Sequence, residues 1–339
     1  MIIEKGKIEF SLKTQNPFVA TMHHIDHFPP GDGNLRPSIK RQYNRNGDFD
    51  TQANWHMYYG KDVPGFPAHP HRGFETVTVV LEGTVDHVDG LGSKGRYSNG
   101  DVQWMTAGKG LQHSEMFPLL STDRENRLEL FQIWLSLDSE HRMVEPNYKM
   151  LWCEEIPVIT VTDHAGLQVK ITLFAGELKG KVAPSPPENS WASNQKNHLS
   201  IQVLELEPSA SYIIPEAYAT MNRSLYFYDG EALSVEKELF TDKGYAFLTA
   251  ETETVIINEG STPAKVLILE AEPILESIVS HGPFVMTTDE EIAQAFKDYK
   301  ETKFGGWPFS SSEIYHDVNQ VRFAKYVDGT VEYPNKKDI

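Results

Sequence analysis

Short runs in which apolar and polar residues alternate, separated by glycine turns, make up much of this chain. Residues 76–81 end at a Glu82–Gly83 turn, residues 199–207 alternate strictly, and residues 264–270 follow a turn at Glu259–Gly260. Alternation with a period of two is typical of a β-strand that buries one face. The pattern therefore predicts an all-β protein.

One helix is predicted near the end of the chain. Thr288 and Glu291 have the spacing of a capping box, in which a threonine and a glutamate satisfy the first free backbone amides of a helix. The apolar residues that recur behind them at helical spacing are Ile292, Ala295, Phe296 and Tyr299. We expect a helix over residues 289–300 that lays one apolar face on a barrel.

The length of 339 residues allows two domains of ordinary size. The polar stretch 138–146 is typical of an interdomain linker. We therefore expect an N-terminal metal-binding domain over residues 1–140 and a C-terminal domain without metal ligands over residues 147–275. The last part, residues 276–339, is expected to pack its helix and tail on the barrels.

The composition, 40% hydrophobic and 23% charged, is that of a globular protein. A net charge of −17 argues against direct binding of nucleic acid, which needs clustered Lys and Arg. No run of eighteen apolar residues exists and the first residues do not resemble a signal peptide, so we expect no membrane insertion and a cytoplasmic location. Cys153 is the only cysteine, which excludes an internal disulfide.

Two pairs of metal-binding side chains stand out, His69 with His71 and His113 with Glu115. Residues two apart on a strand point to the same side, so two such pairs on facing strands of a barrel can converge on one point. Three imidazoles and one carboxylate suit iron, manganese, nickel, cobalt, copper or zinc and leave coordination positions open. Open positions indicate catalysis or sensing.

The second half of the chain contains no comparable pair. No His-x-His sequence follows residue 113, and no two of the later histidines lie within two residues of each other. The histidines of the C-terminal half are His164, His198, His281 and His316. We therefore expect a single metal site, in the first half.

Several longer segments resemble the pirin family of bicupins, over about residues 17 to 305. They are Asp26-His-Phe28, residues 65–78 (GFPAHPHRGFETVT), residues 100–108 (GDVQWMTAG), residues 113–116 (HSEM) and residues 282–286 (GPFVM). The resemblance implies two tandem cupin β-barrels or sandwiches. It also implies that one iron, as Fe(II), is bound by His69, His71, His113 and Glu115.

The resemblance implies an activity as well. Some pirins are quercetin 2,3-dioxygenases, and others are metal-dependent regulators that act through protein partners. It favours a metal-dependent dioxygenase that opens flavonols such as quercetin with dioxygen, with Glu115 as the catalytic proton acceptor. The alternative is a non-enzymatic iron or redox sensor with a regulatory protein partner.

The carboxylate ligand has a competitor. In the wider cupin superfamily it is the glutamate that follows His-x-His, here Glu75, and strand parity alone does not choose between Glu75 and Glu115. The resemblance to pirins favours Glu115, which leaves Glu75 to orient a ligating imidazole.

Other residues near the two pairs receive weaker assignments. Phe66, Gln103 and Met105 are candidates for the pocket wall, and for Phe66 and Met105 the alternative is an ordinary place in the core. The early polar residues His23, His24, Asp26 and His27 are expected to pack or to form hydrogen bonds, and not to bind metal.

Overall fold

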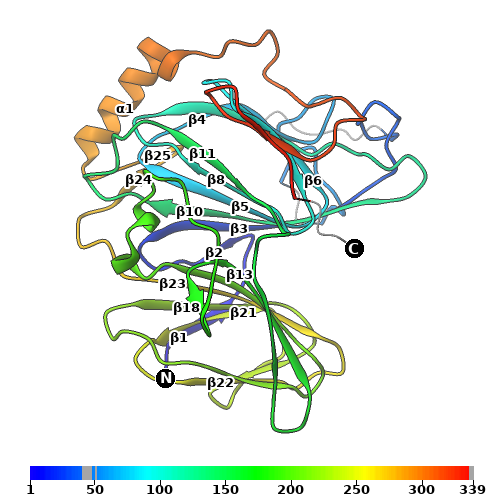
Figure 1. Ribbon diagram of the computed structural model, residues 1–339, viewed down its shortest axis with the longest axis vertical. Coiled ribbons are helices and arrows are strands. Elements are labelled where there is room, and N and C mark those ends of the chain that lie inside the picture. Colours follow the sequence, from blue (N-terminus) through cyan, green and yellow to red (C-terminus); the bar gives the residue numbers. More distant parts are fainter. Residues whose placement is uncertain (40–47, 50–51, 336–339) are drawn as a thin grey trace. The chain divides into compact units, whose positions relative to one another are not determined.

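The computed structural model describes residues 1–39, 48–49 and 52–335 and is built mainly of β-strands, with one α-helix near the C-terminus (Figure 1). The predicted all-β class is confirmed. The three alternating runs are strands β5 (Phe74–Glu82), β16 (Ser200–Leu206) and β23 (Ala264–Ala271). In the part of the chain that is described, no helix is long and apolar enough to cross a membrane.

The chain divides into two compact units. Unit 1 comprises residues 1–21, 155–186 and 190–275, and unit 2 comprises residues 22–154, 187–189 and 276–339. The first 21 residues thus group with the second half of the chain, and the segment from residue 276 onward groups with the first half.

Unit 1 contains a seven-stranded sheet, ordered β1-β21-β18-β23-β16-β13-β12, and a four-stranded sheet, ordered β17-β22-β19-β20. Its other elements are β2 (Ser11–Leu12), β14 (Glu177–Leu178), β15 (Lys181–Val182) and two short 3₁₀ helices, Trp191–Ser193 and Gln195–Asn197. The sheet strands are β1 (Ile2–Lys7), β12 (Val158–Thr162), β13 (Gln168–Ala175), β17 (Ser211–Ile214), β18 (Asn222–Asp229), β19 (Leu233–Val235), β20 (Glu238–Phe240), β21 (Gly244–Thr249) and β22 (Thr254–Asn258), with β16 and β23 as above.

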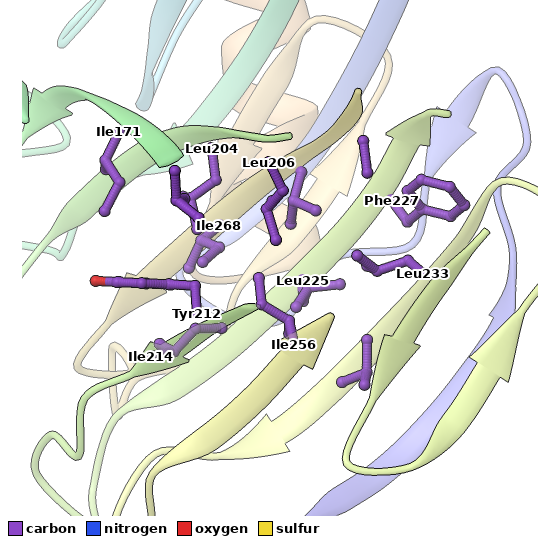
Figure 2. Packing of buried hydrophobic residues seen from close by; sticks show 14 of the residues in the cluster. Ile171, Leu204, Leu206, Tyr212, Ile214, Leu225, Phe227, Leu233, Ile256 and Ile268 are labelled. Atoms are coloured by element: carbon purple, nitrogen blue, oxygen red, sulfur yellow. The ribbon is translucent and has the colours of Figure 1, made fainter. Parts of the chain in front are cut away.

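The core of unit 1 lies between these sheets. Figure 2 shows Leu204, Leu225 and Ile268 of the larger sheet packed against Tyr212 and Ile256 of the smaller one. All five are nearly or fully buried. Apolar side chains fill the space between the sheets.

Unit 2 has the same two-layer construction. One sheet contains the strands β11-β8-β5-β10-β3 in this order, and the other is ordered β27-β26-β7-β6-β9-β4. The strands are β3 (Phe18–Phe28), β4 (Gly65–His71), β6 (Thr84–Asp89), β7 (Lys94–Ser98), β8 (Val102–Thr106), β9 (Leu111–Met116), β10 (Asn126–Ser136), β11 (Asn147–Leu151), β26 (Phe323–Lys325) and β27 (Val331–Glu332), with β5 as above. Apolar residues of both sheets, among them Val80, Val85 and Leu130, form a buried core.

The predicted helix is α1 (Asp289–Thr302), drawn in orange in Figure 1. The N-cap half of its capping box is present, because the Thr288 hydroxyl accepts from the Glu291 amide. The Glu291 carboxylate accepts from the amide of Thr287, one residue before the N-cap, and not from that of Thr288. Ile292 and Ala295 are buried against Phe284 and Met286 of β25 (Phe284–Met286), which pairs with β24 (Val279–His281). Phe296 is 41% exposed, and its ring contacts Phe284 at a centroid distance of 4.8 Å, so it lies at the edge of the apolar face. A short 3₁₀ turn, Lys303–Gly305, follows.

The stretch 138–146 is not the predicted linker. It lies inside unit 2, and the next strand, β11, pairs with β8 of the same unit from Asn147 to Leu151. The chain passes to unit 1 only after Glu154.

Candidate metal centre

The pairing of β4 with β9 brings the two predicted ligand pairs together. His69 lies opposite His113 in this antiparallel pair, and the register shifts between Phe66 and His69. Such a bulge bends a strand and redirects its side chains. Gly65, at φ +132°, starts β4 where a Cβ would lie 2.4 Å from the carbonyl oxygen of Glu115. Only glycine lets the two backbones approach so closely.

His69, His71 and His113 form a compact group. Their ring centroids are 4.8 Å apart for His69 and His71, 4.5 Å for His69 and His113, and 4.9 Å for His71 and His113. One nitrogen of each ring lies within 4.8 Å of the others. Metal–nitrogen bonds of about 2.1 Å place neighbouring ligand nitrogens roughly 3 to 4 Å apart. A small inward movement of the three rings would therefore let them hold one ion.

The hydrogen bonds of the three rings leave nitrogens free for a metal. The Nδ1 of His69 lies 2.9 Å from the carbonyl oxygen of Pro67, to which it donates, so its Nε2 carries the lone pair. The Nδ1 of His71 and the Nε2 of His113 are buried without a hydrogen-bond partner. A buried nitrogen without a partner is unfavourable, and a metal ion would satisfy it. The donor set fits a divalent transition metal.

Burial keeps these rings neutral. Desolvation lowers the pKa of His69, and it lowers the pKa values of His71 and His113 well below the usual range, with neighbouring histidines adding to the shift for both. Neutral imidazole is the form that binds metal. Protons would therefore compete weakly for the site near pH 7.

Glu115 lies beside His113 but belongs to a different group. Its carboxylate oxygens accept hydrogen bonds from Thr78 at 2.9 Å, Tyr97 at 3.2 Å and Gln132 at 3.1 Å. Glu115 groups with His113 and His87, and not with all three histidines of the first group. The structure thus brings the three histidines together and holds Glu115 next to them through contacts with both sheets.

Glu75 sits elsewhere in the barrel wall. It is fully buried and accepts hydrogen bonds from Thr106 at 2.5 Å and from Trp104 at 3.3 Å. None of the candidate metal-binding groups among the described residues contains Glu75. The assignment of Glu115 as the carboxylate ligand stays a prediction.

His87 was missed by the sequence reasoning. It lies on β6, fully buried, with its Nδ1 3.4 Å from the Nδ1 of His113. His87 stands alone between Asp86 and Val88, so no ligand spacing marks it. Only the pairing of β6 with β9 in the folded protein brings His87 next to His113.

A cavity of about 70 Å³ adjoins the histidines. Apolar side chains form most of its wall, and Thr78, Glu115 and Gln132 add polar groups. The apolar lining residues are Met22, Phe66, Phe117, Leu130 and Trp134.

The three residues expected near the cavity separate in the structure. Phe66 lines the cavity, as one of the two expected alternatives had it. Gln103 is fully buried outside the lining, so its predicted place in the wall is wrong. Met105 is also fully buried outside the lining and packs with Ala107 and Leu111, as its core alternative had it.

The early polar residues form hydrogen bonds, as expected. His23 contacts Glu129 at 3.1 Å, and His27 contacts Glu125 at 2.7 Å. The Nδ1 of His24 lies 2.8 Å from the Tyr58 hydroxyl, which donates to Asp26. His24 also lines the cavity, which the sequence did not indicate.

The four histidines of the C-terminal half fall in both units. His164 and His198 belong to unit 1, and His281 and His316 belong to unit 2. The His198 ring stacks on Tyr218 at 4.2 Å. All candidate metal-binding groups among the described residues lie in unit 2.

Comparison with known proteins agrees with this arrangement. The pirin family model matches residues 38–135, and a model described as the pirin C-terminal cupin domain matches residues 202–305. A pirin-like protein of Solanum lycopersicum is 37% identical over 245 residues, covering 71% of this chain and 77% of that protein.

Two further relatives carry the name of an enzyme. A Pseudomonas aeruginosa protein named "Putative quercetin 2,3-dioxygenase" is 37% identical over 257 residues, covering 75% of this chain and 83% of its own. The crystal structure of a quercetin 2,3-dioxygenase from Acinetobacter baumannii has a TM-score of 0.70 at 24% identity and covers 90% of this chain and 98% of its own. At this identity the second likeness shows the shared fold alone.

We predict that His71→Ala or His113→Ala abolishes stoichiometric metal binding and leaves the fold intact, because two barrel cores outweigh one ligand set. Metal content by mass spectrometry and circular dichroism of both variants would check this. His164→Ala, which changes an exposed histidine of unit 1, is the matched control. Full metal occupancy in either site variant would exclude the proposed site.

We predict that Glu115→Gln weakens metal retention more than Glu75→Gln does. Loss of a direct ligand removes a metal bond, whereas loss of an outer-shell group lowers affinity by about 10-fold to 100-fold at most. Competition with a chromophoric chelator would rank the two variants. The opposite ranking would make Glu75 the carboxylate ligand.

We predict a pH-dependent loss of stability that originates at His24. Burial lowers the pKa of His24 from 6.5 to about 3, with His23 and His56 adding to the shift. Below pH 6.5 the unfolded chain binds a proton that the folded protein excludes, so stability falls as the pH falls. At pH 5 this difference is about 2 kcal/mol.

Urea unfolding of the wild type and of His24→Gln at pH 7 and pH 5 would measure this loss. The variant should lose about 2 kcal/mol less than the wild type between the two pH values. Equal losses would show that His24 is not the group responsible.

Proposed function

This chain belongs to the pirin family, and from that premise we propose that it is a metal-dependent dioxygenase that opens flavonols such as quercetin with dioxygen. The metal we propose is Fe(II), bound by His69, His71, His113 and Glu115, with manganese, nickel, cobalt, copper or zinc as alternatives. The name of the Pseudomonas aeruginosa relative supports this choice of reaction.

One observation carries the proposal. Three imidazoles lie together, and His71 and His113 have buried nitrogens without a partner. Two of the three, His69 and His71, line a cavity whose wall also contains Glu115. A structural metal site would be closed by protein ligands, whereas this one has room beside it. The arrangement supports a metal that meets a small molecule.

The residues around the cavity have distinct roles in the proposed reaction. A bound divalent metal would lower the pKa of a flavonol hydroxyl that it coordinates. Glu115, once released from the metal, would accept the proton of that hydroxyl, while Thr78, Tyr97 and Gln132 donate hydrogen bonds to its carboxylate and hold it in place. One flavonol and one dioxygen contain all the atoms of the two products, a depside and carbon monoxide. The reaction therefore needs no added reductant.

The apolar wall would hold the flat rings and exclude water. Phe66 and Trp134, on opposite sheets, offer aromatic surfaces to an aromatic substrate. Phe66 stacks on Tyr58, with ring centroids 4.9 Å apart.

The volume of the cavity favours a second candidate function. A volume of about 70 Å³ is well below the roughly 300–1,000 Å³ of pockets that hold drug-sized ligands, so a flavonol requires side chains such as Phe66 to move aside. A protein that only binds metal and responds to its redox state needs no larger space. A metal-dependent regulator with a protein partner is therefore the alternative.

We predict that the anaerobically iron-loaded protein, mixed with quercetin in air, bleaches the flavonol absorbance with many turnovers per iron. Oxygen uptake and carbon monoxide in the headspace would accompany the bleaching. Fe(II) titration of the metal-free protein should saturate near one equivalent, and His113→Ala should neither bind iron nor turn over. A protein with full iron occupancy and no turnover would contradict the enzyme and support the regulator.

A further inference from the structure

The structure places a fourth histidine, His87, directly behind the candidate metal ligands. His87 is fully buried on β6, and its ring lies 5.3 Å from the ring of His113. The contact between them joins the two Nδ1 atoms at 3.4 Å. The Nε2 of His113 is left without a partner on the other side of the ring.

These contacts determine which nitrogen of His113 carries the proton. The Nε2 of His113 must hold a lone pair to bind metal, so the proton of the neutral ring has to sit on Nδ1. The Nδ1–H of His113 then needs a hydrogen-bond acceptor, and the Nδ1 of His87 lies at hydrogen-bond distance. His87 must in turn carry its own proton on Nε2.

The surroundings of His87 match that second requirement. Its Nε2 has no hydrogen-bond partner and lies 4.0 Å from a carboxylate oxygen of Asp89. The other oxygen of Asp89 accepts the backbone amides of Leu91 and Ser93, which holds the carboxylate in position. A negative charge beside Nε2 favours the tautomer with the proton there.

The ring of His87 is also held in one orientation. It stacks on Tyr148 with a centroid distance of 5.1 Å and an angle of 10° between the planes. Tyr148 is itself buried. Stacking at this angle fixes the plane of the His87 ring, in which its Nδ1 lies 3.4 Å from the Nδ1 of His113.

We propose that His87 is a positioning residue that selects the Nδ1–H tautomer of His113 and so prepares the Nε2 of His113 for metal. Outer-shell acceptors of this kind are usually carboxylates or carbonyl groups, and here the acceptor is a second imidazole backed by Asp89. The inference rests on the histidine group of the proposed function. It does not depend on the reaction that the metal would perform.

Two variants of nearly equal size separate this role from packing. His87→Asn keeps an acceptor for His113, because the oxygen of the introduced amide would take the position of the lost Nδ1. His87→Leu has a similar shape and no acceptor. Both variants lose the stack on Tyr148 equally, and circular dichroism would show that both fold.

The first measurement uses metal-free protein with ¹⁵N-labelled histidine, whose ring tautomers are read by long-range ¹H–¹⁵N correlation. His113 should be in the Nδ1–H form in the wild type and in His87→Asn, and should populate the Nε2–H form in His87→Leu. An Nε2–H form of His113 in the wild type would overturn the proposal. This readout involves neither metal nor turnover.

The second measurement is the dissociation constant for Ni(II), determined by competition with a chromophoric chelator. His87→Leu should bind one equivalent about 10-fold to 100-fold more weakly than the wild type, and His87→Asn should recover most of that loss. Equal weakening in both variants would overturn the tautomer role in favour of packing. Complete loss of Ni(II) binding in both variants would also overturn the positioning role. It would show that His87 is itself a metal ligand, which its grouping with His113 and Glu115 allows.

Discussion

The antiparallel pairing of β4 with β9 is the interaction on which the metal centre depends. It sets His69 opposite His113, and a shift of one residue would turn either side chain to the other face of the sheet. The close approach at Gly65 and the bulge after Phe66 belong to the same pairing. The second sheet of unit 2 contributes Thr78 and Gln132 to Glu115 across the barrel. The site is therefore a property of both layers.

This arrangement carries a free-energy cost that the rest of the fold must offset. Each buried nitrogen without a partner costs about 1–3 kcal/mol, and both His71 and His113 contain one. The apolar cores of the units supply the compensating stability, since burial of apolar surface contributes about 25 cal/mol per Å². The metal-free protein thus holds its ligands in an unfavourable electrostatic state that a cation would relieve.

Much of the fold and part of the site could be predicted from the sequence, because both depend on local patterns. Strands such as β16 show their alternation directly, and His69-x-His71 needs only the period of one strand. His87 lay beyond this reasoning because its contact with His113 depends on how β6 pairs with β9. Helical spacing likewise could not tell that Phe296 lies at the edge of the buried face, where its ring contacts Phe284 and stays 41% exposed. The polar residues 138–146 resemble a linker, but the strand that follows them returns to the same sheet.

The first strand has a consequence for the order of synthesis. β1 pairs with β21 in unit 1, from Ile2 opposite Leu248 to Lys7 opposite Gly244. A ribosome that adds about 5–20 residues per second makes this partner on the order of 10 to 50 s after β1 has been made. During that interval β1 has no partner strand, and β21, once made, presents an open sheet edge until β1 joins it. β1 therefore has to be kept from pairing with other strands until more than two thirds of the chain has been made.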